Sequence, residues 1–164
     1  MPDSVVVMGV AGSGKSTVGR ALADRLGLAY VDADDLHSHA SVAKMSGGLP
    51  LDDADRAPWL ASVGRWLSER DGGVAACSAL RRRYRDAIRE TAPDAVFVHL
   101  SARLDLVSGR VSARPDHFMP VDLVESQYAA LESLEADEDG LTVDAGQAVD
   151  AIVDESLRYL VQRR

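Results

Sequence analysis

Five short apolar runs, separated by longer segments with helical periodicity, are the feature that most constrains the fold of this chain. Each run has the length of one strand. Strands that alternate with helices are typical of a parallel sheet whose crossover connections pack on both faces. We therefore predict an α/β protein with strands at SVVVMG, LAYVD, GVAACS, AVFVHLS and GLTVDA.

Two of the intervening segments carry clear helix signals. Residues 15–26 have helical periodicity and are followed by Gly27, which predicts a helix with a glycine C-cap. The segment DDADRAPWLASVGRWLSER begins with acids suited to a helix N-terminus. Helical spacing places its large apolar residues on one stripe, which we interpret as core rather than as a ligand-stacking site: Trp59, Val63, Trp66 and Leu67.

Composition limits the classes of partner. The 164 residues fit one domain, residues 1–164, and their net charge of −8 disfavours nucleic acid or an anionic membrane surface. No apolar run reaches the length of a membrane span, and the first residues lack the basic region of a secretion signal. Cys77 is the single cysteine, so no internal disulfide is expected, which favours a reducing cytoplasm.

The stretch GVAGSGKST joins the first predicted strand to the first predicted helix and fits the pattern G-x-x-x-x-G-K-[ST]. Glycines let the backbone curl so that its N–H groups point at phosphate oxygens, and the helix N-terminus adds positive potential. Lys15 is expected at the β and γ phosphates and the Ser16 hydroxyl at Mg²⁺. We therefore predict that ATP and Mg²⁺ bind at Gly9, Ala11, Gly12, Ser13, Gly14, Lys15, Ser16 and Thr17.

Three acids follow the second predicted strand, at the edge where ligands of parallel sheets bind. If the strand continues through VDADD, Asp32 and Asp34 share one face. We predict that the acids converge on the magnesium, with Asp32 as a partner of the ion and its waters and Asp34 as the group that deprotonates an acceptor hydroxyl. Asp35 is interpreted as the cap of the next helix. His37 fits an acceptor contact and a surface position equally well.

Arginines occur at two places that suit anion binding. Most arginines of SALRRRYRDAIRE are expected on a solvated face, but Arg81 and Arg85 lie four apart, so a fork there suits a substrate carboxylate. Arg110 and Arg114 are also four apart and precede a proline-containing loop, which suits a lid that excludes water. Stabilisation of a helix C-terminus is the alternative for Arg110.

Beyond these motifs, the sequence resembles the gluconate kinases (gluconokinases), small bacterial P-loop kinases related to shikimate and nucleoside monophosphate kinases. The resemblance covers nearly the whole chain and is carried by DADDLH, KMSGGLPLDDADRAPWL, CSALRRRYRDAIR, ARPDHFM, ESQYAALE and TVDA. It implies an adenylate-kinase-like fold with a five-stranded parallel sheet and a mobile lid. It also implies ATP-dependent phosphorylation of the 6-hydroxyl of D-gluconate, and it suggests a homodimer.

The resemblance also implies roles for individual residues. It places Asp34 and His37 at the sugar acid and makes Arg56 a second candidate on the substrate side. In the lid, such kinases stack one arginine on adenine and present another to the phosphates, which fits Arg110 and Arg114. The predicted catalytic set is Lys15, Asp34 and Arg114, and the predicted substrate-binding set is Asp34, His37, Arg56, Arg81 and Arg85.

Two alternatives stay open. A kinase of the same fold could act on another small anionic acceptor, such as shikimate or a different aldonate. A nucleotide acceptor fits less well, because the acceptor-side segments are rich in Asp, His and Arg rather than apolar walls for a base. A nucleotide-dependent binding module would keep the phosphate loop but would not need Asp34, His37 and Arg85. The late acids of ADEDG are interpreted as a solvated loop.

Overall fold

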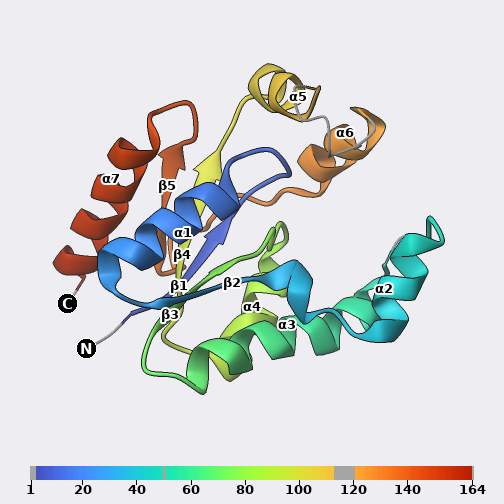
Figure 1. Cartoon of the computed structure of the whole chain (residues 1–164), viewed down its shortest axis with the longest axis horizontal. Coiled ribbons are helices and arrows are strands. Elements are labelled where there is room, and N and C mark those ends of the chain that lie inside the picture. Colours follow the sequence, from blue (N-terminus) through green and yellow to red (C-terminus); the bar gives the residue numbers. More distant parts are fainter. Residues whose placement is uncertain (1–2, 50, 113–120, 164) are drawn as a thin grey trace.

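The computed structural model describes residues 3–49, 51–112 and 121–163. It contains a five-stranded parallel sheet with the strand order β2-β3-β1-β4-β5 (Figure 1). Each of the five predicted apolar runs forms one of these strands, so the predicted sheet is confirmed. The strands are β1 (Ser4–Met8), β2 (Ala29–Asp32), β3 (Gly73–Ala76), β4 (Val96–Ser101) and β5 (Gly140–Asp144).

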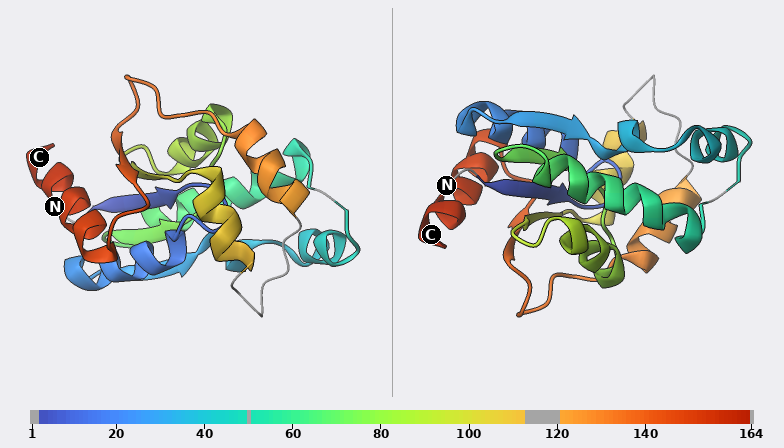
Figure 2. Two further views of the ribbon diagram at one scale, coloured as in Figure 1. Left: turned by 90° about the horizontal axis from the view of Figure 1, so that it is seen from above. Right: turned by 90° about the horizontal axis from the view of Figure 1, so that it is seen from below.

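Helices cover both faces of the sheet (Figures 1 and 2). Their bounds are α1 (Lys15–Leu26), α2 (His39–Ser46), α3 (Asp53–Ser68), α4 (Arg82–Thr91), α5 (Leu104–Ser112), α6 (Val121–Ala130) and α7 (Val149–Gln162), with a short 3-10 helix, η1 (Ala33–Leu36), after β2. In the described part of the chain, no helix is both long enough and apolar enough to cross a membrane.

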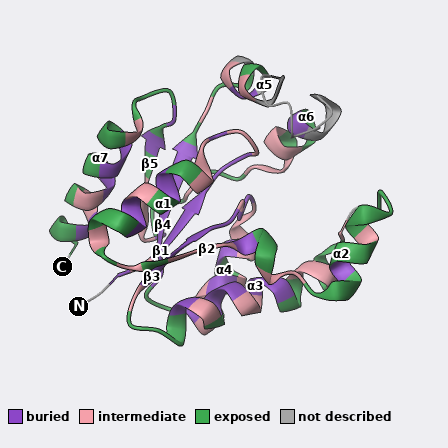
Figure 3. Cartoon of the chain, in the orientation of Figure 1, coloured by how far each residue is buried: buried purple, intermediate pink, exposed green. Residues whose placement is uncertain are grey.

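Side chains of the central strand β1 alternate between two apolar clusters. Val5 and Val7 pack with α1 and α7, whereas Val6 and Met8 pack with α3 and α4. All four are fully buried, and Figure 3 shows the buried residues along the sheet and the inner helix faces. β1 is thus fixed from both sides, and its carboxyl end is a rigid starting point for the turn that follows.

The two helices predicted in most detail form as expected. α1 has the predicted bounds, and Gly27 ends it with a φ of 69°, a left-handed conformation that favours glycine. In α3, Asp52 and Asp55 form a reciprocal capping box at the N-terminus. Trp59 and Val63 are buried against the sheet, which confirms the core interpretation of this stripe.

The connections at the carboxyl edge of the sheet lie apart from the chain termini, which lie together at the other end of the molecule (Figure 2). α5 and α6 pack there through a third apolar cluster that includes Val107, Val124 and Val10 of the turn after β1. α2 projects from the body and is mainly exposed (Figure 3). The ion pair between Lys44 Nζ and Asp55 Oδ2, at 2.6 Å, ties α2 to the start of α3.

A buried ion pair joins α4 to the segment before β5. The side chains of Arg85 and Glu138 are both 0% exposed, and Arg85 Nε and Nη2 donate to the two Glu138 carboxylate oxygens at 2.7 and 3.0 Å. Arg89 also donates to Glu138. The interpretation of ADEDG as only a solvated loop is therefore wrong at Glu138, because this acid is the buried counterion of two α4 arginines.

Hydrogen bonds decide the charge state of Glu138. Burial alone would raise the pKa of this carboxyl, but hydrogen bonds from Arg85, the Glu135 N–H and Arg89 outweigh burial and hold its pKa at about 2. The carboxylate therefore stays ionised in the folded protein.

We expect Glu138→Gln to lower the free energy of unfolding at neutral pH by about 3–5 kcal/mol, because it leaves Arg85 buried without its counterion. Glu135→Gln is the matched control: Glu135 pairs with Arg82 at the surface of the same segment, so the expected loss is below about 1 kcal/mol. Urea unfolding followed by circular dichroism measures both variants.

The same pair predicts a pH dependence. The folded-state pKa of Glu138 is lowered, so its stabilisation is complete above the ordinary value of 4.5 and is lost as the pH falls toward about 2. The difference in the free energy of unfolding between the wild type and Glu138→Gln should therefore become smaller as the pH falls over this range. A difference that is the same at pH 7 and at about pH 2.5 would contradict this account.

Candidate active site

The turn between β1 and α1 has the geometry of a phosphate loop. Gly9, Gly12 and Gly14 all have positive φ values, of 152°, 80° and 98°. At Gly9 a Cβ atom would lie 2.7 Å from Ser13 Oγ and 2.9 Å from the carbonyl oxygen of Leu100, so no side chain fits there. The loop therefore depends on glycine both for its backbone conformation and for its close approach to β4.

Lys15 and Ser16 lie where the loop enters α1. Lys15 Nζ donates to the carbonyl oxygen of Val10 at 3.0 Å, so its side chain curls back over the loop. Ser16 Oγ donates to Asp32 Oδ2 at 3.2 Å. Thr17 follows on the exposed side of α1. The structure thus brings together the Ser16 hydroxyl of α1 and the Asp32 carboxylate at the end of β2, which the sequence predicts to share a magnesium ion.

The three acids at the end of β2 and just after it are arranged differently from the prediction. The strand ends at Asp32 rather than continuing, and η1 begins at Ala33. Asp32 Oδ1 accepts a hydrogen bond from the Asp34 N–H at 3.0 Å, so Asp32 caps η1. Asp35 does not cap the next helix, because Ser38 caps α2. The expected shared face of Asp32 and Asp34 on an extended strand is therefore wrong, since the chain turns between them.

The acids also do not form a cage for a metal ion. Among the described residues, no three His, Cys, Asp or Glu side chains gather closely enough to hold a metal. The expected convergence of all three acids is thus not found. Mg²⁺ is usually held by one or two protein oxygens together with substrate phosphates and water. The pair Ser16 and Asp32 fits that pattern without the other acids.

His37 directly follows η1, and its side chain is almost fully buried. Its ring stacks on Trp59 with centroids 4.2 Å apart and planes 15° apart, and its side chain is 5% exposed. Trp59 Nε1 donates to the carbonyl oxygen of Ala33 at 2.6 Å, which locks α3 to η1. Burial lowers the pKa of His37, Asp34 partly offsets this and Arg56 adds to it, so the imidazole is neutral at pH 7.

Asp34 lies beside His37 but is open to solvent. Its Oδ1 is 3.9 Å from His37 Nε2, and its side chain is 84% exposed. Desolvation and the Asp32 carboxylate both raise the pKa of Asp34, whereas His37 and Lys15 oppose the rise. Because the side chain is so exposed, repulsion from Asp32 is the cause we favour. A carboxylate with a raised pKa is a better proton acceptor than an ordinary aspartate.

Two of the predicted substrate arginines, Arg56 and Arg81, are partly exposed. Arg56 of α3 is 33% exposed and donates to Tyr84 Oη at 3.2 Å. Its charge acts on the pKa of His37, so it lies within electrostatic reach of that ring. Arg81, at the start of α4, is 34% exposed, and its Nη1 lies 3.6 Å from Glu132 Oε2.

The third predicted substrate arginine, Arg85, does not line this site. Besides its pair with Glu138, its guanidinium donates to the carbonyl oxygens of Ala79, Leu80 and Ser133. All its N–H donors are thereby used, and the side chain is fully buried. A substrate carboxylate would have to displace Glu138 to reach it, so the geometry favours a structural role for Arg85.

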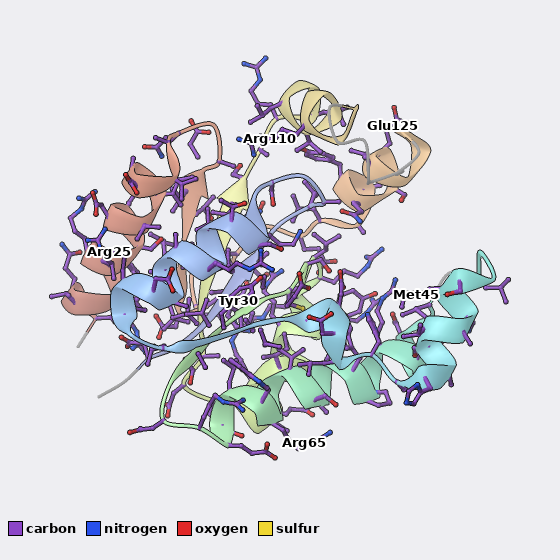
Figure 4. All side chains as sticks on the ribbon, viewed as in Figure 1. Arg25, Tyr30, Met45, Arg65, Arg110 and Glu125 are labelled. Carbon is purple, nitrogen blue, oxygen red and sulfur yellow. The ribbon has the colours of Figure 1, made fainter. Side chains whose placement is uncertain are left out.

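Arg110 of α5 lies against the phosphate loop. It reaches from α5 to the carbonyl oxygens of Gly12 and Ser13, at 3.2 and 3.1 Å, and to that of Ala145 at 3.0 Å (Figure 4). The structure thus places Arg110 against the phosphate loop and the turn after β5. Arg114, predicted as a catalytic residue of the lid, lies outside the described residues.

Sequence reasoning missed two contributors to the site. The sequence predicts Trp59 as a core residue alone, yet it also stacks on His37. The helical periodicity of apolar residues is the same for both roles, so it could not separate them. Gln127 of α6 was not singled out, yet its Oε1 accepts a hydrogen bond from the Ala11 N–H in the phosphate loop at 2.6 Å. The one signal in the sequence was the glycine-rich loop itself, because its backbone N–H groups need hydrogen-bond acceptors.

Comparisons with known proteins agree with this geometry. The sequence profile of the shikimate kinase family matches residues 11–160. A gluconokinase of Gluconobacter oxydans is 43% identical over 162 residues, covering 96% of this chain and 91% of the relative. A gluconokinase structure from Sinorhizobium meliloti aligns with a TM-score of 0.89 at 43% identity, covering 99% of this chain and 93% of that one. An unliganded sugar kinase structure from Janibacter sp. gives 0.90 at 42%, covering 98% and 95%. A phosphate loop with acidic and basic side chains near it, together with relatives of this similarity over nearly their whole length, shows that the chain belongs to the gluconokinase family of P-loop kinases.

Proposed function

We propose that this protein transfers the γ-phosphoryl group of ATP to the 6-hydroxyl of D-gluconate, giving 6-phospho-D-gluconate and ADP. The observation that carries the proposal is the juxtaposition of two half-sites. Ser16 of the phosphate loop is hydrogen-bonded to Asp32, and Asp32 in turn caps the short helix that presents Asp34. A nucleotide bound at the loop would therefore face an acceptor bound at Asp34.

On the nucleotide side, the chain supplies charge and positioning. The Lys15 ammonium, which now bonds to Val10, is close enough to the loop to turn toward the β and γ phosphates. Ser16 and Asp32 would hold Mg²⁺, which neutralises phosphate charge when it is bound. Arg110 would contact the nucleotide from the opposite side of the loop.

On the acceptor side, the proposed mechanism follows the proton and the phosphoryl group. The Asp34 carboxylate accepts the proton of the 6-hydroxyl while this oxygen bonds to the γ-phosphorus and the bond to the ADP oxygen breaks. His37, neutral and fixed by Trp59, is proposed to hydrogen-bond a sugar hydroxyl. Arg56 and Arg81 are proposed to bind the gluconate carboxylate, since both are partly exposed. Arg114 as a catalytic residue, the cytoplasmic location and the homodimer stay predictions.

The direct test is ADP release with Mg²⁺ and ATP across D-gluconate, other aldonates, shikimate and nucleoside monophosphates. We expect strong stimulation by D-gluconate. Stimulation by a different acid alone would move the substrate and keep the mechanism. Slow hydrolysis that no acceptor stimulates would favour the binding-module alternative.

We expect Asp34→Asn to reduce kcat by roughly a hundredfold or more, because an amide does not accept the hydroxyl proton. ATP affinity should stay nearly unchanged. Asp35→Asn is the matched control, an exposed neighbour on the same short helix, and should keep most of the wild-type rate. An equal loss of ATP affinity in Asp34→Asn would assign this residue to the metal instead.

The raised pKa of Asp34 also predicts the pH profile. A base works only when ionised, so the rate falls as the pH drops through the pKa of Asp34. Burial and repulsion from Asp32 raise this pKa above its ordinary value of 3.8, and Mg²⁺ held at Asp32 would weaken that repulsion, so the acid limb should lie at higher pH at low Mg²⁺ than at saturating Mg²⁺. The limb should be present in kcat/KM of the wild type and of Asp35→Asn. Its persistence in the residual activity of Asp34→Asn would assign it to another group.

Arg56→Met tests the carboxylate contact. Removing a charged hydrogen-bond donor that contacts the substrate should raise KM for gluconate by about 10-fold to 100-fold, with KM for ATP nearly unchanged. Arg65→Met is the control, because Arg65 lies on the same helix with its hydrogen bond to Ser62 on the exposed side (Figure 4). An unchanged KM for gluconate in Arg56→Met would leave Arg81 as the candidate.

A further inference from the structure

The Gln127 side chain connects α6 to the tip of the phosphate loop. Its Oε1 accepts the Ala11 N–H at 2.6 Å, across 116 positions of sequence. The contact is partly buried, so water competes with it only in part. It is a hydrogen bond between a neutral amide and the backbone of the segment that receives the triphosphate.

Two further contacts hold α6, the helix that carries Gln127. Val124, one helical turn earlier on α6, is buried in the cluster with Val10 and Val107. Tyr128, the next residue, donates its hydroxyl proton to the carbonyl oxygen of Ala102 at 2.6 Å. α6 is therefore fixed both to the loop and to the chain after β4, and Gln127 is delivered to Ala11 from a fixed position.

Side chains from other elements thus bind both the N–H groups and the carbonyl oxygens of the phosphate loop. Gln127 holds an N–H, whereas Arg110 of α5 holds the carbonyl oxygens of Gly12 and Ser13. Within the loop, the Ser13 N–H donates to the Val10 carbonyl. Glycine-rich loops lose much conformational freedom on ordering, so contacts that order the loop in advance reduce the entropic cost of binding phosphate.

We propose that Gln127 is a positioning residue that holds the phosphate loop in its nucleotide-binding shape before ATP arrives. Its neutral amide suits this task, because a carboxylate at the same place would repel the triphosphate. The proposal deepens the proposed kinase function and rests on its use of ATP.

Gln127→Met tests the proposal, since methionine has a similar length but lacks the acceptor. Titration calorimetry with Mg²⁺ and ATP, without any acceptor, should show a Kd about three- to tenfold higher than that of the wild type. The affinity for adenosine, which has no phosphates, should be unchanged. Glu125→Gln is the matched control: Glu125 is an exposed residue of the same helix (Figure 4), so ATP affinity should stay as in the wild type.

Gln127→Glu distinguishes the effect of charge at this position from the effect of the hydrogen bond to Ala11. Glutamate keeps the acceptor for the Ala11 N–H but adds a negative charge, so it should weaken ATP binding more than methionine does and again spare adenosine.

Three results would overturn the proposal. An unchanged Kd for ATP in Gln127→Met would show that the loop needs no such support. Tighter binding would show that the amide competes with phosphate, and equal weakening for adenosine would indicate general damage to the fold. The calorimetry contains no acceptor, so it does not depend on the kinase assay. If the wild type binds ATP but does not phosphorylate gluconate, the proposed function is wrong and the proposal for Gln127 can still be tested.

Discussion

The burial of β1 on both faces is the constraint on which the site depends. Its valines touch the helices of both layers, and its hydrogen bonds to β3 and β4 leave it no freedom to shift. Since all strands are parallel, their carboxyl ends meet at one edge. The phosphate loop after β1 and the acidic turn after β2 therefore meet there, although β3 lies between the two strands.

Much of this arrangement could be predicted from local sequence. The apolar runs, the bounds of α1 and its end at Gly27 follow from periodicity and capping, which are properties of neighbouring residues. The phosphate loop was predictable because its glycines, lysine and serine have fixed offsets. The proximity of Ser16 and Asp32 followed from parallel-strand geometry, without any contact being known.

The remaining features depend on partners far away in the sequence. A run of arginines has the same pattern whether it faces solvent, a substrate or a buried acid, so the pairing of Arg85 with Glu138 was not predictable from the run itself. The contact of Gln127 with Ala11 was hidden for the same reason. The turn at Asp32 was missed because its carboxylate competes locally for the backbone N–H of Asp34 and ends the strand early.

The Arg85–Glu138 pair has a consequence for synthesis of the chain. Its partners are separated by 53 positions, and α4 is made long before Glu138 leaves the ribosome. Until then Arg85 has no counterion, so burying it would cost several kcal/mol, on the order of the whole stability of a small domain. The first four strands should therefore stay only loosely assembled on the ribosome, exposed to chaperones and proteases, until the segment before β5 emerges.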